Sequence, residues 1–140
     1  MTDQGHESGG CLCGAVRYDF DRSSVVSASH CHCRDCQRST GSGFTTFFAM
    51  PETAFRIASG ELRSFSVTGE SGGTLTRSFC PQCGSPIMSK ASIVPSLVFV
   101  KAGSLDDASW VAPSSAYWGS SAQPWAPTDP RIHVHDRNPT

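Results

Sequence analysis

Seven cysteines are spread over this 140-residue chain, and they fall into three groups. Three of them, Cys31, Cys33 and Cys36, stand together in the segment SHCHCRDCQRSTG. The other four form one pair near the beginning of the chain and one pair past its middle: Cys11, Cys13, Cys80 and Cys83. Four thiolates complete the tetrahedral coordination of a structural zinc ion, whereas a catalytic zinc site keeps one position open. The count therefore predicts one closed and one open zinc site, two zinc ions per chain.

The two cysteine pairs have the local features of a closed site. Glycines flank Cys11 and Cys13, and the segment from Cys80 to Gly84 has the form of a zinc knuckle, in which Pro81 presets a turn. Because a long stretch of chain separates the pairs, we expect one metal to clamp loops from distant strands. The alternative is redox chemistry at the second pair. A thioredoxin-like motif precedes a helix, however, and here glycine and proline follow instead.

The three clustered cysteines have the spacing of an open site. In an extended backbone, Cys31 and Cys33 point to one face and the histidines between and before them point to the other. A turn then brings the thiolate of Cys36 back toward Cys33. Soft sulfur is a favoured zinc ligand, so the thiol of a substrate suits the fourth position. The segment therefore predicts chemistry on thiols.

Two alternatives remain open at this cluster. The second zinc could be another structural ion whose fourth ligand comes from elsewhere in the chain; the candidate ligands are His30, His32, Asp35, His133 and His135. Arg34 and Arg38 flank the cluster, and they are equally suited to receive a carboxylate of a substrate or to remain solvated surface charges.

The elements around the cysteines are predicted to be mainly strands. Val16, Tyr18 and Phe20 alternate with polar residues, which is typical of a strand with one buried face. A second strand begins at Val25 and leads into the cysteine cluster, and a short helical turn over Arg34–Thr40 ends at Gly41. Further short strands are expected at 44–50, 55–57, 62–67, 74–79, 87–90, 97–102 and 116–118, with a glycine-bearing turn over 69–73. Such a series predicts a mainly β, sandwich-like or barrel-like fold of short antiparallel strands.

The length predicts one domain, over residues 9–128. Residues 1–8 and residues 129–140 are polar and are expected to form flexible tails. Two prolines flank Trp125, so the segment 123–127 is expected to be irregular.

Charge and hydropathy exclude several classes of partner. The formal net charge is −1 and there is no basic stripe, which disfavours nucleic-acid binding. No apolar run reaches the roughly 18 residues of a membrane span. The N-terminal segment lacks the apolar region of a signal peptide, so we expect a cytoplasmic protein. In that reducing compartment, clustered cysteines are more often metal ligands than disulfides. The sequence makes no prediction of oligomeric state.

Three motifs together resemble one known family. They are GCLCGAVRY at 10–18, CHCRDCQRSTG at 31–41 and RSFCPQCGSP at 77–86, and the stretch GSLDD at 103–107 is similar as well. These segments resemble the glutathione-dependent formaldehyde-activating enzyme (GFA) family, which is shared with centromere protein V, over roughly residues 9–125. The resemblance implies an Mss4-like fold with a structural zinc on the two cysteine pairs. It also implies a second zinc, tied to activity, on Cys31, Cys33 and Cys36.

The activity implied by the resemblance is the formation of S-(hydroxymethyl)glutathione from formaldehyde and glutathione, which is a carbon–sulfur lyase reaction run in reverse. The expected partner is a small thiol such as glutathione or its aldehyde adduct. The family's tail carries an aromatic residue near a proline, and Trp125 is similar; it could lie over the site or be an ordinary core or surface tryptophan. With three ligands, the second zinc should be held more weakly than the first.

Two rival interpretations apply to a fold of this type. One is a non-catalytic binding module that zinc merely stabilises, which predicts no open position at the second metal. The other is a redox protein related to methionine sulfoxide reductases. That interpretation needs a nucleophilic cysteine outside the zinc sites, and all seven cysteines are already assigned.

Overall fold

The computed structural model describes residues 5–69 and 72–138, and within them the strands form two sheets. The smaller sheet has the order β1-β2-β5, and both of its pairs are antiparallel. Its strands are β1 (His6–Gly10), β2 (Arg17–Asp21) and β5 (Arg56–Ser59). The hairpin between β1 and β2 contains the first cysteine pair, so this sheet positions one half of the predicted closed site.

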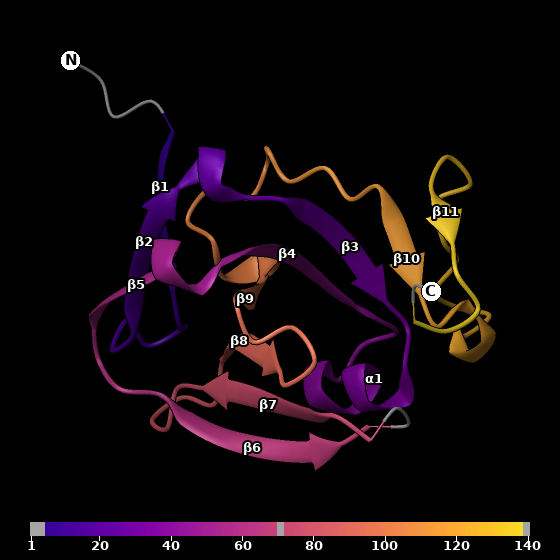
Figure 1. Ribbon diagram of the computed structural model, residues 1–140, viewed down its shortest axis with the longest axis horizontal. Helices are drawn as coiled ribbons and strands as arrows, with labels where there is room; N and C mark the ends of the chain where they lie inside the picture. Colours follow the sequence, from indigo (N-terminus) through magenta and orange to yellow (C-terminus); the bar gives the residue numbers. More distant parts are fainter. Residues whose placement is uncertain (1–4, 70–71, 139–140) are drawn as a thin grey trace.

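The larger sheet has the order β11-β10-β3-β4-β9-β8-β7-β6. Strand β10 pairs in parallel with β3 and with β11, and the other pairs are antiparallel. Figure 1 shows that this sheet curves, so that β6 and β7 lie across the molecule from β3 and β4, with helix α1 between them. Its strands are β3 (Ser27–Cys31), β4 (Thr45–Pro51), β6 (Arg63–Thr68), β7 (Thr74–Phe79), β8 (Pro86–Ala91), β9 (Leu97–Lys101), β10 (Ser115–Tyr117) and β11 (His133–Val134).

Helix is a minor component of the described chain. The α-helix is α1 (Arg34–Thr40), and single-turn 3₁₀ helices occupy Arg22–Ser24, Glu52–Ala54, Ala102–Ser104 and Gly119–Ser121. The prediction of a mainly β fold with little helix is confirmed, as is the helical turn over Arg34–Thr40. No helix in residues 5–69 and 72–138 has the length and apolar character needed to cross a membrane.

The core lies between the two sheets. Tyr18 and Phe20 point into it from β2, as their alternation with polar residues predicted, and both are buried. Phe48 and Met50 of β4 are fully buried from the opposite side, and the rings of Phe20 and Phe48 are 5.3 Å apart between centroids. Burying each such side chain contributes about 1.5–3 kcal/mol to the free energy of folding. The core therefore uses one face of the larger sheet and leaves the other face available.

The register of the larger sheet determines what the other face carries. Thr45 of β4 lies opposite Cys31 of β3, and Phe47 of β4 lies opposite Lys101 of β9. Residues directly opposite each other share a face, and residues two apart along a strand do so as well. Because Phe48 points into the core, these four side chains lie on the face away from it. The first cysteine of the cluster is thus beside an aromatic ring and a lysine.

The segment 103–107 fastens the β1–β2 hairpin to the larger sheet. The carboxylate of Asp106 forms an ion pair with Arg17 and accepts a hydrogen bond of 2.8 Å from Ser8 Oγ. The hydroxyl groups of Tyr18 and Ser104 are 2.6 Å apart. These contacts give a structural role to the GSLDD stretch, because they hold the hairpin that carries Cys11 against the end of β9.

The prediction of flexible tails is wrong for two segments. Residues 6–8 belong to β1, where the buried carboxylate of Glu7 accepts a hydrogen bond of 2.9 Å from Trp110 Nε1 and pairs with Arg22. Near the other end, β11 lies beside β10, and His135 N donates to Ala116 O at 2.8 Å. Residues 1–4 and 139–140 of the predicted tails, and residues 70–71 of the predicted turn over 69–73, lie outside the described residues.

Candidate metal centres

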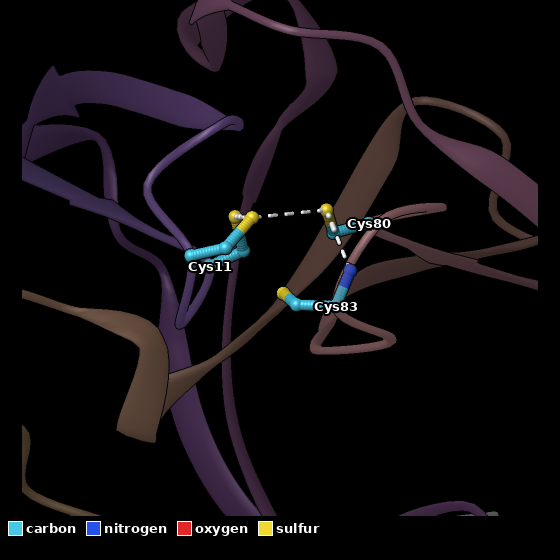
Figure 2. A group of neighbouring side chains, drawn as sticks. Cys11, Cys80 and Cys83 are labelled. Atoms are coloured by element: carbon cyan, nitrogen blue, oxygen red, sulfur yellow. Dashed lines mark hydrogen bonds between the residues drawn. The ribbon is translucent and has the colours of Figure 1, made fainter.

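The two cysteine pairs meet at one point. The sulfur atoms of Cys11, Cys13, Cys80 and Cys83 all lie within 4.8 Å of one another. Figure 2 shows that Cys11 lies on the loop after β1, whereas Cys80 and Cys83 lie on the loop between β7 and β8. The Sγ atoms of Cys11 and Cys13 are 3.6 Å apart, and those of Cys13 and Cys80 are 3.8 Å apart. Four sulfurs at about 2.3 Å from a zinc ion would be separated by about 3.8 Å, so this four-sulfur cluster fits zinc.

Backbone amides surround the four-sulfur cluster. Val16 N donates to Cys11 Sγ at 3.2 Å, and this contact lowers the pKa of Cys11. On the other loop, Gln82 N lies 3.4 Å from Cys80 Sγ. Gly84 has a φ angle of +80°, which the turn needs for its N–H to reach Cys80 O at 2.8 Å. N–H donors of this kind stabilise thiolates, so the loops are built for charged sulfur.

Ser85 connects the two loops of the four-sulfur cluster. Its hydroxyl oxygen is 3.2 Å from Cys83 Sγ and accepts a hydrogen bond of 3.0 Å from Leu12 N. The hydroxyl and the backbone of Ser85 lower the pKa of Cys83 to about 5. Cys83 is therefore prepared to act as a thiolate ligand near neutral pH. The sequence analysis missed this serine, although it follows the zinc-knuckle motif directly.

The other three cysteines form a second cluster at the junction of β3 and α1. Cys31 is the last residue of β3, Cys33 is the N-cap of α1, and Cys36 lies in the first turn of that helix. Their sulfur atoms lie within 4.8 Å of one another, and Cys33 Sγ accepts a hydrogen bond of 3.2 Å from Cys36 N. The helix ends at Gly41, whose φ angle of 70° is left-handed, as the sequence predicted. Strand end and helix start thus present three thiols to one point.

Hydrogen bonds among the three thiols of this second cluster shift their pKa values in opposite directions. Cys31 and Cys36 both hydrogen-bond to the sulfur of Cys33, so the pKa of Cys33 falls well below its ordinary value. The same contacts, together with burial, raise the pKa of Cys31. Cys33 is therefore the first sulfur of the cluster to ionise. Three sulfurs with one thiolate already favoured are a suitable donor set for a soft metal ion such as zinc.

A buried glutamine ties this three-sulfur cluster to the late part of the chain. Gln37 Nε2 donates to His32 O at 2.7 Å and to Ser121 O at 3.0 Å, and Gln37 Oε1 accepts a hydrogen bond of 3.0 Å from Gln123 Nε2. The amide of Gln37 thereby fixes α1 against the end of β3 and against residues 121–123. Sequence analysis missed Gln37, and its only signal there was a polar residue directly after the last cysteine of the cluster.

No histidine or carboxylate among residues 5–69 and 72–138 joins the three sulfurs as a fourth ligand. His30 Nδ1 instead lies 2.7 Å from Thr46 Oγ1, and the rings of His133 and His135 contact each other at 4.3 Å between centroids. His32 is 1% exposed and packs against Phe44. None of the residues that the sequence analysis named as a possible fourth metal ligand therefore lies with the three sulfurs.

A cleft of about 650 Å³ opens beside the three-sulfur cluster, between the two ends of the curved sheet. Arg77 Nη2 lies 3.9 Å from Cys36 Sγ, and Lys101 Nζ donates to Thr45 Oγ1 at 3.0 Å. Burial lowers the pKa of Lys101, and the nearby sulfur of Cys36 opposes that effect. In the part of the chain that the structure describes, neither cation forms an ion pair with a carboxylate.

Only some of the side chains that the sequence analysis named line the cleft. Arg34 lines it, together with Asp35, whereas Arg38 does not. Trp125 is 68% exposed, packs next to Gly43 and is not among the side chains that line the cleft, which favours the alternative of a surface tryptophan. Arg77 and Lys101 were missed. The signal for Lys101 was a lysine that ends an otherwise apolar strand, LVFVK.

The fold and the two sulfur clusters together define a small, mainly β protein with the donor sets of a metalloprotein. The family model for the glutathione-dependent formaldehyde-activating enzyme matches residues 6–121, and the chain belongs to this family. A crystal structure of a Rhodobacter sphaeroides protein has a similar fold, with a TM-score of 0.58 and 20% sequence identity over 76% of this chain and 91% of that one. Among curated proteins, none matches the chain in sequence.

Proposed function

We propose that this protein is a zinc-dependent enzyme that forms and cleaves the carbon–sulfur bond of a thiol–aldehyde adduct, as in S-(hydroxymethyl)glutathione. The observation that carries this proposal is the three-sulfur cluster, to which no described residue adds a fourth ligand, at one end of a cleft where Arg77 and Lys101 have no carboxylate partner among the described residues. Membership of the family supports the reaction class. All seven cysteines are free, which suits the reducing cytoplasm as the place of action.

In this proposal one cluster is structural and the other is catalytic. Cys11, Cys13, Cys80 and Cys83 hold a structural zinc. Cys31, Cys33 and Cys36 hold the second zinc and are the residues in contact with the reacting sulfur. Cys31, Cys33 and Cys36 would hold the zinc ion, which would supply Lewis acidity to a thiol of the substrate at this point.

The reaction needs no oxidant or reductant. The substrate sulfur forms a bond to the aldehyde carbon, the π electrons of the carbonyl group move to its oxygen, and the proton released by the thiol ends on that oxygen. Lys101 and Arg77 face the cleft, where a cation stabilises the negative charge that develops on the oxygen. Thr45 holds the ammonium group of Lys101 in place through the hydrogen bond to its Oγ1. Cleavage of the adduct follows the same path in reverse.

Two measurements on the same zinc-loaded sample test the proposal. Native mass spectrometry counts zinc ions and bound glutathione per chain, and exchange NMR measures how fast formaldehyde and glutathione interconvert with their adduct. We expect two zinc ions, a glutathione adduct of the two-zinc form, and exchange faster than without protein. The Cys36→Ser variant should lose one zinc and the acceleration, whereas Ser39→Ala, on the exposed side of α1, should keep both.

The same data decide between the enzyme and the binding module. Two zinc ions that are indifferent to any thiol, without acceleration, would favour a module that zinc only stabilises. Full exchange activity of the Cys36→Ser variant with both zinc ions retained would contradict the assignment of the three-sulfur cluster.

A further inference from the structure

The cleft beside the three-sulfur cluster is apolar over most of its wall. The rings of Phe47 and Phe99 form an edge-to-face pair with centroids 5.5 Å apart, and Leu75 and Val94 line the wall beyond them. Ile93 also lines it and is 67% exposed. Phe47, Phe99 and Leu75 lie on the face of the sheet opposite the core, where a sheet that faces water would carry polar residues, and Ile93 and Val94 extend this surface from the turn between β8 and β9. Contiguous apolar surface of this kind marks a site for a ligand or partner.

The strand register places the apolar wall directly behind the sulfurs. Phe47 stands two residues along β4 from Thr45, the neighbour of Cys31, so about 7 Å separates the two positions along the strand. Phe99 lies opposite Ser89, which in turn lies opposite Arg77. A ligand whose sulfur reaches the cluster therefore has its next few atoms beside the rings of Phe47 and Phe99, with the cations Lys101 and Arg77 at the edge of these rings.

The charges in the cleft select for an anion. Arg34, Arg77 and Lys101 contribute three positive charges to its described lining, and Asp35 contributes the single negative one apart from the sulfurs. Arg77 stands on the same row as Phe99, on the far side of Ser89 from it. A carboxylate attached to a ring that lies on Phe99 would thus point toward a guanidinium group, which is its best-matched partner.

We propose that the adduct this cleft accepts carries an aromatic body with a carboxylate, and not the hydrophilic tripeptide body of glutathione. The inference rests on the proposed function, because it takes the three-sulfur cluster as the place where the thiol binds. Amide groups that lie on the rings of Phe47 and Phe99 would lose water that the rings do not replace with hydrogen bonds, which is costly. An apolar body would gain from the same desolvation.

The first test compares three thiols on the zinc-loaded wild-type protein by calorimetry. The thiols are 4-(mercaptomethyl)benzoic acid, 3-mercaptopropionic acid and glutathione, so that a carboxylate is present in all and an apolar body in one. We expect the aromatic acid to bind at least about tenfold more tightly than either of the others, equivalent to about 1.4 kcal/mol.

The second test uses a matched pair of variants. In Phe99→Ala the preference for the aromatic acid should fall to within about threefold of 3-mercaptopropionic acid, because the ring loses its partner. Phe65→Ala, which removes an exposed phenylalanine that does not line the cleft, should keep the preference. Zinc content and melting temperature of each variant show whether it is folded, and Phe99→Leu serves in its place if the alanine variant is not.

The results distinguish failure of the inference about the apolar body from failure of the proposed function. If glutathione binds as tightly as the aromatic acid or more tightly, the inference about the apolar body is overturned while the proposed function stands. If Phe99→Ala keeps the preference in a folded, two-zinc protein, the inference is likewise overturned. If none of the three thiols binds and none exchanges with formaldehyde, the proposed function itself fails.

Discussion

The two sulfur clusters differ in where their ligands come from and in what surrounds them. The four-sulfur cluster joins a loop of the smaller sheet to a loop of the larger one, and backbone amides and Ser85 surround it. The three-sulfur cluster draws on one short segment at the junction of β3 and α1, and side chains of a cleft border it. A cross-link stabilises a fold mainly by closing a long loop of the unfolded chain. The first cluster therefore suits stability and the second suits chemistry.

The local charges follow the same division. Near the four-sulfur cluster, the guanidinium of Arg17, whose pKa Asp106 raises and Cys11 raises slightly further, is already paired with Asp106. Beside the three-sulfur cluster, Arg77 and Lys101 have no carboxylate partner among the described residues. Unpaired cations that are partly buried are costly to keep unless a ligand uses them. The contrast teaches that neighbouring charge, and not the count of sulfurs alone, separates a structural centre from a reactive one.

The largest difference between the clusters should appear in stability. Cys80→Ser removes a ligand that links the two sheets, so we expect the free energy of unfolding of the zinc-loaded protein to fall by more than about 4 kcal/mol, because loss of a structural metal is among the most destabilising changes. Guanidinium denaturation measures this change. Cys36→Ser is the control, and it should cost less than about 2 kcal/mol because its metal would close only a short loop. Equal losses in the two variants would remove the distinction.

Acidification should separate the clusters next. Protons compete with metal for thiolates, so both sites lose zinc as the pH falls. Each cluster has one thiol with a lowered pKa, Cys83 or Cys33, and one with a raised pKa, Cys13 or Cys31, so the pKa shifts alone do not separate the clusters. Because the three-sulfur cluster has one thiolate ligand fewer, it should release its zinc at the higher pH. A colorimetric zinc indicator during a pH titration should show two steps, and Cys36→Ser should abolish the step nearer neutrality. A single step in the wild type would contradict the comparison.

The smallest effect concerns the unpaired arginine of the cleft. Arg77→Met keeps an apolar stem but removes the guanidinium, so binding of a carboxylate-bearing thiol should weaken about tenfold. Stability should change by no more than about 0.5 kcal/mol. Calorimetry with 4-(mercaptomethyl)benzoic acid measures the affinity. Arg63→Met, an exposed arginine on β6 that does not line the cleft, is the matched control. Loss of the second zinc from Arg77→Met would instead mean that the arginine only balances the charge of the sulfurs.

The sequence predicted the parts of the site that depend on local spacing. Cysteines two or three residues apart can reach one metal ion whatever the rest of the chain does, so the three-sulfur cluster and each pair of the four-sulfur cluster followed from local spacing. That the two pairs share one site followed from the count of cysteines, and the structure brings the four sulfurs together. The helix over Arg34–Thr40 was also predictable, because Gly41 accepts the left-handed conformation that ends it.

The parts that were missed depend on long-range pairing. Lys101 and Phe99 face the cleft because of the register between β4, β8 and β9, which no local pattern reveals. Strand β1, with the polar sequence HESGG, has no apolar alternation. It is held in place by its pairing with β2 and by the hydrogen bonds of Glu7. Strand β11 is two residues long and depends on β10 in the same way.

The hydrogen bonds of Gln37 have a consequence for synthesis of the chain. The N-terminal part of a chain leaves the ribosome first, so the segment with Cys31, Cys33 and Cys36 emerges well before Ser121 and Gln123, which hold it in place. The amide of Gln37 can form its hydrogen bonds with the carbonyl of Ser121 and the side chain of Gln123 only after residues 121–123 have also left the ribosome. In a nascent chain this segment is therefore a loose chelating peptide. Its precise shape is among the last features to be completed.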